Sequence, residues 1–164
     1  MTPHQRFALV LRAKAVVAAA FLALVALTLR HPVSLIVGAL DLLLLPIFWR
    51  LAQRDLALAT HALVAQTALF LLPRQFVQGY VNGVNWVIYV VLPAIAVFVL
   101  GTSRAAALST MLTALIALPS MAAAIWLLPP GITRSDVITL AAFVLALMIA
   151  LGWLLARGSV EPRG

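Results

Sequence analysis

Long apolar runs, separated by short polar segments, recur along the whole chain and restrict its fold more than any other feature. Each run is close to the ~20 residues that a helix needs to cross the ~30 Å hydrocarbon core of a bilayer. Hydrophobic residues make up 65% of the chain and charged residues 9%, which excludes an ordinary soluble domain. We expect an all-α, polytopic membrane bundle in which residues 1–164 form a single transmembrane domain with six helices, at about 8–29, 33–49, 55–72, 84–100, 105–128 and 136–157.

Basic residues give the expected orientation of this bundle. With a cytoplasmic N-terminus, eight of the eleven Lys and Arg residues fall in segments on the inner side and three fall outside. An excess of positive charge marks cytoplasmic loops. Trp49 and Trp153 fall at predicted inner ends and Trp86 and Trp126 near outer ends, as expected for an aromatic belt. The sequence therefore predicts both termini inside (N-in/C-in), and the scattered basic residues do not form the patch that nucleic acid would need.

Asp41 interrupts the run from 35 to 48, which otherwise carries no charge. A charge at the centre of a membrane helix costs roughly 2.5–3.5 kcal/mol on insertion scales, so we expect it to be paired, protonated or functional. His61 lies at a similar predicted depth on the other side of the basic turn 50–54. We predict an Asp41–His61 pair, either as a proton-sensitive or ligand-binding site or as a hydrogen bond that only joins two helices.

The external connection from 73 to 86 is the second candidate site. Aromatic side chains and adaptable amides are suited to the mouth of a small-ligand site. The alternative is an interfacial loop whose aromatic rings lie at the lipid headgroups. The candidate residues here are Arg74, Gln78, Tyr80, Asn82, Asn85 and Trp86.

Small residues recur at helical spacing in three of the predicted helices. Close helix contacts in lipid favour small side chains, so we expect these stripes to pack inside the bundle or between protomers. They are Ala15, Ala19 and Ala23; Ala106, Thr110, Thr113, Ala117, Ser120 and Ala124; and Ala142, Ala146 and Ala150.

Several chemistries lack candidate residues. Lys14, the only lysine, is predicted near the inner end of the first helix, and His4, His31 and His61 do not share a helix face at haem or zinc spacing. No phosphate-binding loop, serine-hydrolase or zinc-protease motif occurs. We expect no catalysis by this chain, no metal and no cofactor.

Three passages carry a resemblance to a known class of membrane region. They are the turn Arg50-Leu-Ala-Gln-Arg54, the passage Leu100-Gly-Thr-Ser-Arg104-Ala-Ala-Ala-Leu108 and the exit Trp126-Leu-Leu-Pro-Pro130. Together, across about 33–157, the chain resembles the N-terminal multi-helix membrane regions of bacterial sensor histidine kinases and diguanylate cyclases. The resemblance implies the bacterial cytoplasmic (inner) membrane, a homodimer, and a last helix that leads to a cytoplasmic output domain not in this chain.

We therefore expect a sensor and signal-transducing module that detects a small or lipophilic ligand, or a state of the membrane. Its expected partners are the lipid bilayer, such a ligand and a second copy of the chain. The alternatives are a small stand-alone transporter or channel subunit, with Asp41 as the ion or proton site, and a structural membrane partner protein.

Overall fold

A computed structural model of the protein describes residues 1–27, 32–75, 86–128 and 131–158. Within these residues the chain forms six helices: α1 (Pro3–Leu27), α2 (Pro32–Ala52), α3 (Leu56–Gln75), α4 (Trp86–Leu100), α5 (Ser103–Ala124) and α6 (Arg134–Gly158). All six predicted helices are present. The bounds differ most at the start of α1, which begins five residues earlier than expected, and at the end of α5, which stops four residues earlier.

Side-chain caps explain where α1 and α6 begin. The Thr2 backbone N–H donates to Gln5 Oε1 over 2.8 Å, and the Gln5 N–H donates to Thr2 Oγ1 over 3.3 Å. This reciprocal pair is a capping box, and Pro3 between its members suits the first helical position. At α6 the Thr133 N–H donates to Asp136 Oδ2 over 2.9 Å and the Asp136 N–H donates to Thr133 Oγ1 over 3.2 Å.

The starts of α3 and α5 are also capped. Asp55 Oδ1 accepts the N–H of Leu58 over 2.9 Å, which fixes the first turn of α3. Thr102 Oγ1 accepts the N–H of Ala105 over 3.1 Å at the start of α5. Gly101, with φ of 67°, makes the sharp turn from α4 into this cap, and the left-handed region is one that glycine adopts without steric cost.

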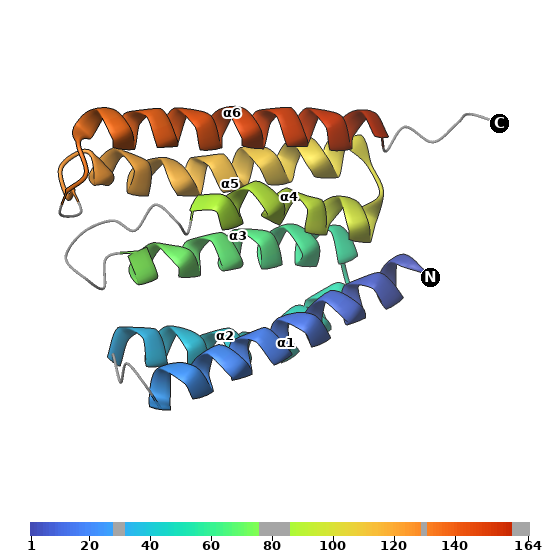
Figure 1. Cartoon of the computed structure of the whole chain (residues 1–164). Helices are drawn as coiled ribbons and strands as arrows, with labels where there is room; N and C mark the ends of the chain where they lie inside the picture. The colour runs from blue at the N-terminus through green and yellow to red at the C-terminus, as the bar shows by residue number, and fades with distance from the viewer. Residues whose placement is uncertain (28–31, 76–85, 129–130, 159–164) are drawn as a thin grey trace.

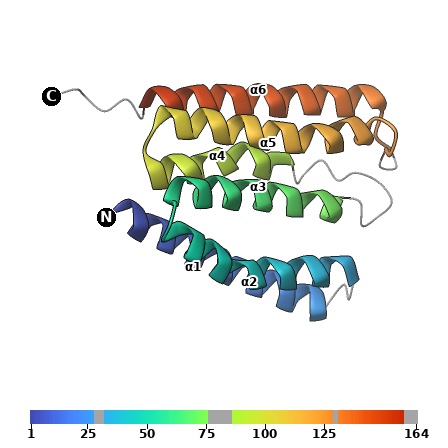
Figure 2. The same ribbon diagram turned by 180° about the vertical axis from the view of Figure 1, so that it is seen from behind.

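The helices run side by side, and α1 and α2 form a hairpin along one side of the bundle made by α3–α6 (Figures 1 and 2). The hairpin packs on the rest of the molecule through α2 against α3 and α1 against α4. It diverges from α3 toward the end where α1 finishes and α2 begins (Figure 1). The start of α1 and the end of α6 lie at the same end of the molecule (Figure 1).

Two clusters of buried side chains hold the helices together. The larger one lies among α3–α6 and includes Trp86, Tyr89 and Met148. The smaller one joins α1 and α2 to the rest of the bundle and includes Phe7 and Phe48. Large apolar side chains also cover the outward faces, as a lipid-facing surface requires.

Four of the helices, α1, α2, α5 and α6, are long and apolar enough to cross a membrane. In α3 and α4 the apolar stretches are shorter and cover 56–72 and 88–100. Both of these helices have neighbours on several sides, since α3 contacts α2, α4 and α5, and α4 contacts α1, α3, α5 and α6. The chain thus has the composition and helix lengths of a membrane protein.

Of the three predicted stripes of small residues, one faces the interior of the bundle and two are mostly exposed. The stripe on α5 lies on its inward face, where Thr113, Ala117 and Ser120 are completely buried. The stripes on α1 and α6 do not pack inside the described bundle, because most of their alanines are exposed. The inward face of α1 instead carries Leu11, Ala18 and Val25, which follow one another at intervals of seven residues.

One glycine allows α5 and α6 to approach closely. A Cβ atom placed on Gly152 of α6 would lie 2.5 Å from Oγ1 and 2.9 Å from Cγ2 of Thr110 on α5. No real Cβ contact is this short, so the interface between these two helices depends on the absence of a side chain at position 152.

Candidate functional site

Asp41 lies within α2 and forms an ion pair with Lys14 of α1, at 2.9 Å between Lys14 Nζ and Asp41 Oδ1. The two side chains are only 12% and 10% exposed. Lys14 belongs to the same inward face of α1 as Leu11 and Ala18, which directs its side chain toward the interior of the molecule. Asp41, the one charged residue of its apolar run, therefore has a basic partner within the bundle.

Two residues of α3 complete this site. Gln66 Nε2 donates to Asp41 Oδ1 over 2.9 Å, and Lys14 Nζ donates to Thr67 Oγ1 over 2.6 Å. The Thr67 hydroxyl in turn donates to the backbone carbonyl of Leu63 over 2.7 Å. We call Lys14, Asp41, Gln66 and Thr67 the polar cluster. It connects α1, α2 and α3 within otherwise apolar helices.

The polar cluster is electrically neutral but costly to disturb. Both side chains are largely shielded from solvent, so the ammonium and the carboxylate rely on each other and on their hydrogen bonds. Charge-assisted hydrogen bonds of this kind are roughly twice as strong as neutral ones. Gln66 Oε1 is buried and has no hydrogen-bond partner among the described residues. The cluster therefore contains an acceptor that can take a hydrogen bond if the helices rearrange.

The predicted Asp41–His61 pair is wrong, because the turn between the two helices is not where the sequence analysis placed it. Asp41 lies eleven residues before the end of α2 at Ala52, and His61 lies only five residues after the start of α3. At 1.5 Å per residue these are about 16 Å and 7.5 Å from the turn. Gln66, ten residues into α3, matches the depth of Asp41 instead.

His61 contacts a different helix. Its Nδ1 lies 2.9 Å from Oγ of Ser109 on α5, and its side chain is partly buried. The contact joins α3 to α5 within the larger bundle. His61 thus belongs to a separate polar contact and not to the polar cluster.

Lys14 was not predicted as a site residue, because the apolar run alone places it near the end of its helix. Because α1 begins at Pro3, Lys14 is eleven residues from its start and close to its middle. Two features of the sequence point to this position. The capping box formed by Thr2 and Gln5 marks the earlier start of the helix, and the spacing of Leu11, Lys14 and Ala18 places the lysine on the inward face.

Most of the second candidate site, the external connection, lies outside the described residues. This applies to Gln78, Tyr80, Asn82 and Asn85. Arg74 lies in the last turn of α3, and Trp86 is the first residue of α4. The expectation of an interfacial Trp86 is wrong, because its side chain is only 1% exposed and belongs to the larger core cluster. The proposed ligand mouth stays a prediction.

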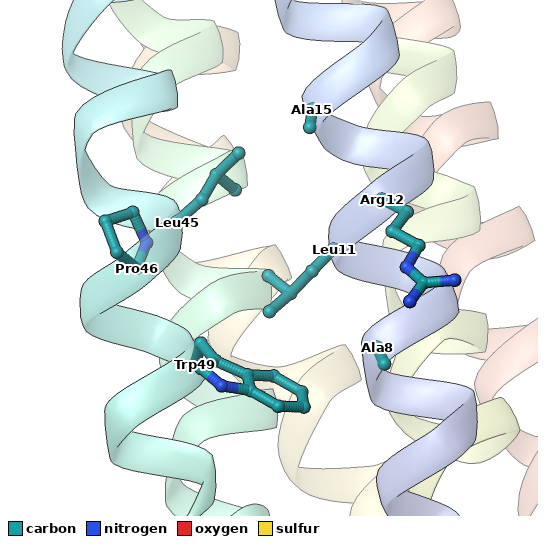
Figure 3. A pocket seen from close by; sticks show the side chains of 7 residues that line it. All are labelled: Ala8, Leu11, Arg12, Ala15, Leu45, Pro46 and Trp49. Atoms are coloured by element: carbon teal, nitrogen blue, oxygen red, sulfur yellow. The ribbon is translucent and has the colours of Figure 1, made fainter.

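A groove of about 350 Å³ opens between the N-terminal half of α1 and the C-terminal half of α2 (Figure 3). It lies next to the polar cluster, since Ala15 follows Lys14 and Leu45 is one helical turn from Asp41. Its lining is mostly apolar and contains a single cation. The lining residues are Ala8, Leu11, Arg12, Ala15, Leu45, Pro46 and Trp49.

A second tie joins α1 to the bundle at the end where α1 begins. Arg6 Nη1 donates to the backbone carbonyl of Phe98 on α4 over 3.1 Å, and its guanidinium lies 5.9 Å from the centre of the Phe98 ring. The hairpin is therefore held at this end by Arg6 and the short turn into α3, and farther along by the polar cluster.

In the part of the chain that the structure describes, no group of three or more His, Asp or Glu could hold a metal ion. No protein-family model, curated protein or solved structure matches this chain.

Proposed function

We propose that the chain is a membrane module with six transmembrane helices and both termini in the cytoplasm, located in the bacterial inner membrane. The eight-to-three distribution of basic residues supports this orientation. The start of α1 and the end of α6 lie at the same end of the molecule, which is compatible with this orientation (Figure 1). The shortest helix, α4, has 15 residues and spans about 22 Å, and it packs against α1, α3, α5 and α6.

The function that we infer is sensing: the module responds to a lipophilic ligand or to a state of the membrane. The observation that carries this proposal is the polar cluster, which joins the α1–α2 hairpin to α3 in addition to the smaller hydrophobic cluster. Apolar residues stabilise a buried interface at least as well as an ion pair does. The hydrogen bonds of the polar cluster, unlike the slowly varying Coulomb attraction, require close and directed contacts. We propose on this basis that the hairpin alternates between an attached and a detached state.

Contacts on α3 and α5 offer a route from the polar cluster to α6. On α3, His61 contacts Ser109 of α5 over 2.9 Å. The next residue of α5, Thr110, lies against Gly152 of α6. A displacement of α3 that follows detachment of the hairpin would therefore be transmitted through α5 to the last helix.

In this proposal α6 passes the change to a cytoplasmic output domain, and the module acts as a homodimer. The support is the resemblance to the membrane regions of sensor histidine kinases and diguanylate cyclases. The position of α6 adds to it, because α6 packs mainly on α4 and α5 and has a wide outward face.

Double electron–electron resonance between two spin labels tests the proposal. The chain contains no cysteine, so Ile36→Cys on α2 and Ile138→Cys on α6, both exposed positions, carry the labels alone. The labelled protein is placed in bilayers of short-chain and of long-chain phosphatidylcholine. We expect two distance populations whose ratio changes with bilayer thickness, and a single population in both bilayers for Asp41→Asn.

Asp55→Asn is the matched control, because it makes the same substitution at the exposed cap of α3 and asparagine also caps helices. It should behave as the unsubstituted protein does. The result would contradict sensing if the spin labels showed a single distance population that changed neither with bilayer thickness nor with Asp41→Asn. That result would favour a structural partner protein. Ion or proton flux into proteoliposomes that Asp41→Asn abolishes would instead identify a transporter.

A further inference from the structure

The groove between α1 and α2 has the chemistry of a lipid site. Leu11, Leu45 and Trp49 face the space between the two helices. The Arg12 side chain leaves α1 on the side away from α2, and its guanidinium is turned toward the level of Ala8, the N-terminal end of α1 (Figure 3). A long basic side chain with this orientation keeps its stem on apolar surface and its charge at the membrane interface. Tryptophan is also typical of that depth.

We propose that this groove binds an anionic phospholipid, with one acyl chain along the apolar lining and the headgroup phosphate on Arg12. The volume of about 350 Å³ is sufficient for part of one acyl chain. Charge complementarity identifies the headgroup, since the lining contains a guanidinium and no acid. A guanidinium binds phosphate oxygens through paired N–H groups.

The surroundings favour the same occupant. Arg50 and Arg54 lie at the end of α2 that the groove approaches, and both are exposed. Basic residues at a membrane surface attract anionic lipids. The proline of the lining, Pro46, has no N–H to donate to the Leu42 carbonyl, and it turns its ring outward on an exposed part of α2.

A bound lipid would lie directly beside the polar cluster. Its chain would reach Ala15 and Leu45, which are adjacent to Lys14 and one turn from Asp41. It would thereby fill the space between α1 and α2 at the depth where the ion pair forms. The occupant of the groove thus becomes a candidate for the lipophilic ligand of the proposed sensor.

Quenching of Trp49 fluorescence by brominated lipids tests the site. The protein is reconstituted with brominated phosphatidylglycerol or brominated phosphatidylcholine, and the difference from Trp49→Phe isolates the signal of Trp49. We expect about a fivefold preference for phosphatidylglycerol, the factor expected for one cation near an anionic headgroup. Arg12→Gln should reduce this preference to about one.

Arg104→Gln is the control for general surface attraction, because the exposed Arg104 lies in the first turn of α5 and does not line the groove. It should retain the preference, and an equal loss in both variants would overturn the proposal. Ala8→Leu fills the groove and should weaken quenching by both lipids, which keeps the test decisive even if Arg12→Gln fails to fold. Equal quenching by the two lipids in the unsubstituted protein would also overturn it.

This inference rests on the proposed membrane placement, which a separate measurement checks. Gln53→Cys, in the exposed turn between α2 and α3, should be labelled by a membrane-impermeant maleimide only from the cytoplasmic side. Brominated lipid is present in both leaflets, so the quenching result does not depend on orientation. A failed placement and a failed lipid site are therefore distinguishable.

Discussion

Removal of one charge from the polar cluster should destabilise the protein far more than removal of both. Asp41→Asn retains the shape of the side chain and an acceptor for Gln66, but it leaves the Lys14 ammonium, 12% exposed, without its carboxylate. Breaking a buried ion pair from one side costs about 3–5 kcal/mol. A charge at the centre of a membrane helix costs roughly 2.5–3.5 kcal/mol on insertion scales. We expect a loss of about 3 kcal/mol, or about a hundredfold in the unfolding equilibrium.

The double variant Lys14→Met/Asp41→Leu removes the stranded charge. Apolar replacement of a buried ion pair is often neutral or stabilising. Here it also deprives Gln66 and Thr67 of their partners, and interhelical hydrogen bonds in membranes are worth about 0.6–1.7 kcal/mol. The double variant should therefore lie within about 1–2 kcal/mol of the unsubstituted protein. Lys14→Met alone should cost about as much as Asp41→Asn.

The free energy of unfolding can be measured for the unsubstituted protein, Asp41→Asn and the members of the cycle Lys14→Met, Asp41→Leu and Lys14→Met/Asp41→Leu. Reversible denaturant unfolding in mixed micelles, followed by far-ultraviolet circular dichroism, gives these values. A double-mutant cycle on these values gives the coupling between the two residues. Single variants that each cost less than about 1 kcal/mol would refute the energetic role of the pair. A double variant as unstable as the sum of the singles would show that the two charges do not interact.

Three further predictions concern contacts of α5 with other parts of the molecule. Gly152→Ala should cost about 1–3 kcal/mol in unfolding free energy because its Cβ collides with Thr110, and the additional substitution Thr110→Ala should restore most of the loss. Thr102→Ala removes the cap of α5 and should lower the unfolding free energy by about 1 kcal/mol, whereas Thr102→Ser should leave it nearly unchanged. Ser109→Ala should cost about 1 kcal/mol through the lost contact with His61, and the two substitutions Ser109→Ala and His61→Phe together should not cost the sum of their separate effects. Additive effects of these last two would contradict a direct contact.

The helices could be predicted because the feature that defines them is local. Runs of apolar residues near membrane-crossing length are visible in the sequence, and each of the six corresponds to a helix. The ends of the helices were predicted less accurately where a capping residue, and not the hydrophobic pattern, decides where the helix begins. Thr2 and Gln5 start α1 among polar residues, and the apolar run alone gives no reason to begin there.

The site could be predicted only in part, because pairing depends on where two helices end. Asp41 is conspicuous in its apolar run, but its partner follows from the exact position of the turn between α2 and α3. An error of three residues at the end of α2 is enough to select His61 in place of Gln66. The pairing with Lys14 depends in addition on which face of α1 packs inward, and this is set by tertiary contacts of Leu11 and Ala18.

The ion pair between Lys14 and Asp41 also has a consequence for the synthesis of the protein. In the proposed placement, α1 and α2 each bring one member of the ion pair into the hydrocarbon core during insertion, at roughly 2.5–3.5 kcal/mol apiece. Only four residues separate the two helices, so the second can reach the first as soon as it leaves the ribosome and enters the translocon. The two segments should therefore partition into lipid together, with Lys14 and Asp41 already paired. Truncated nascent chains that end before Asp41 should keep α1 at the translocon, and chains extended beyond it should release both.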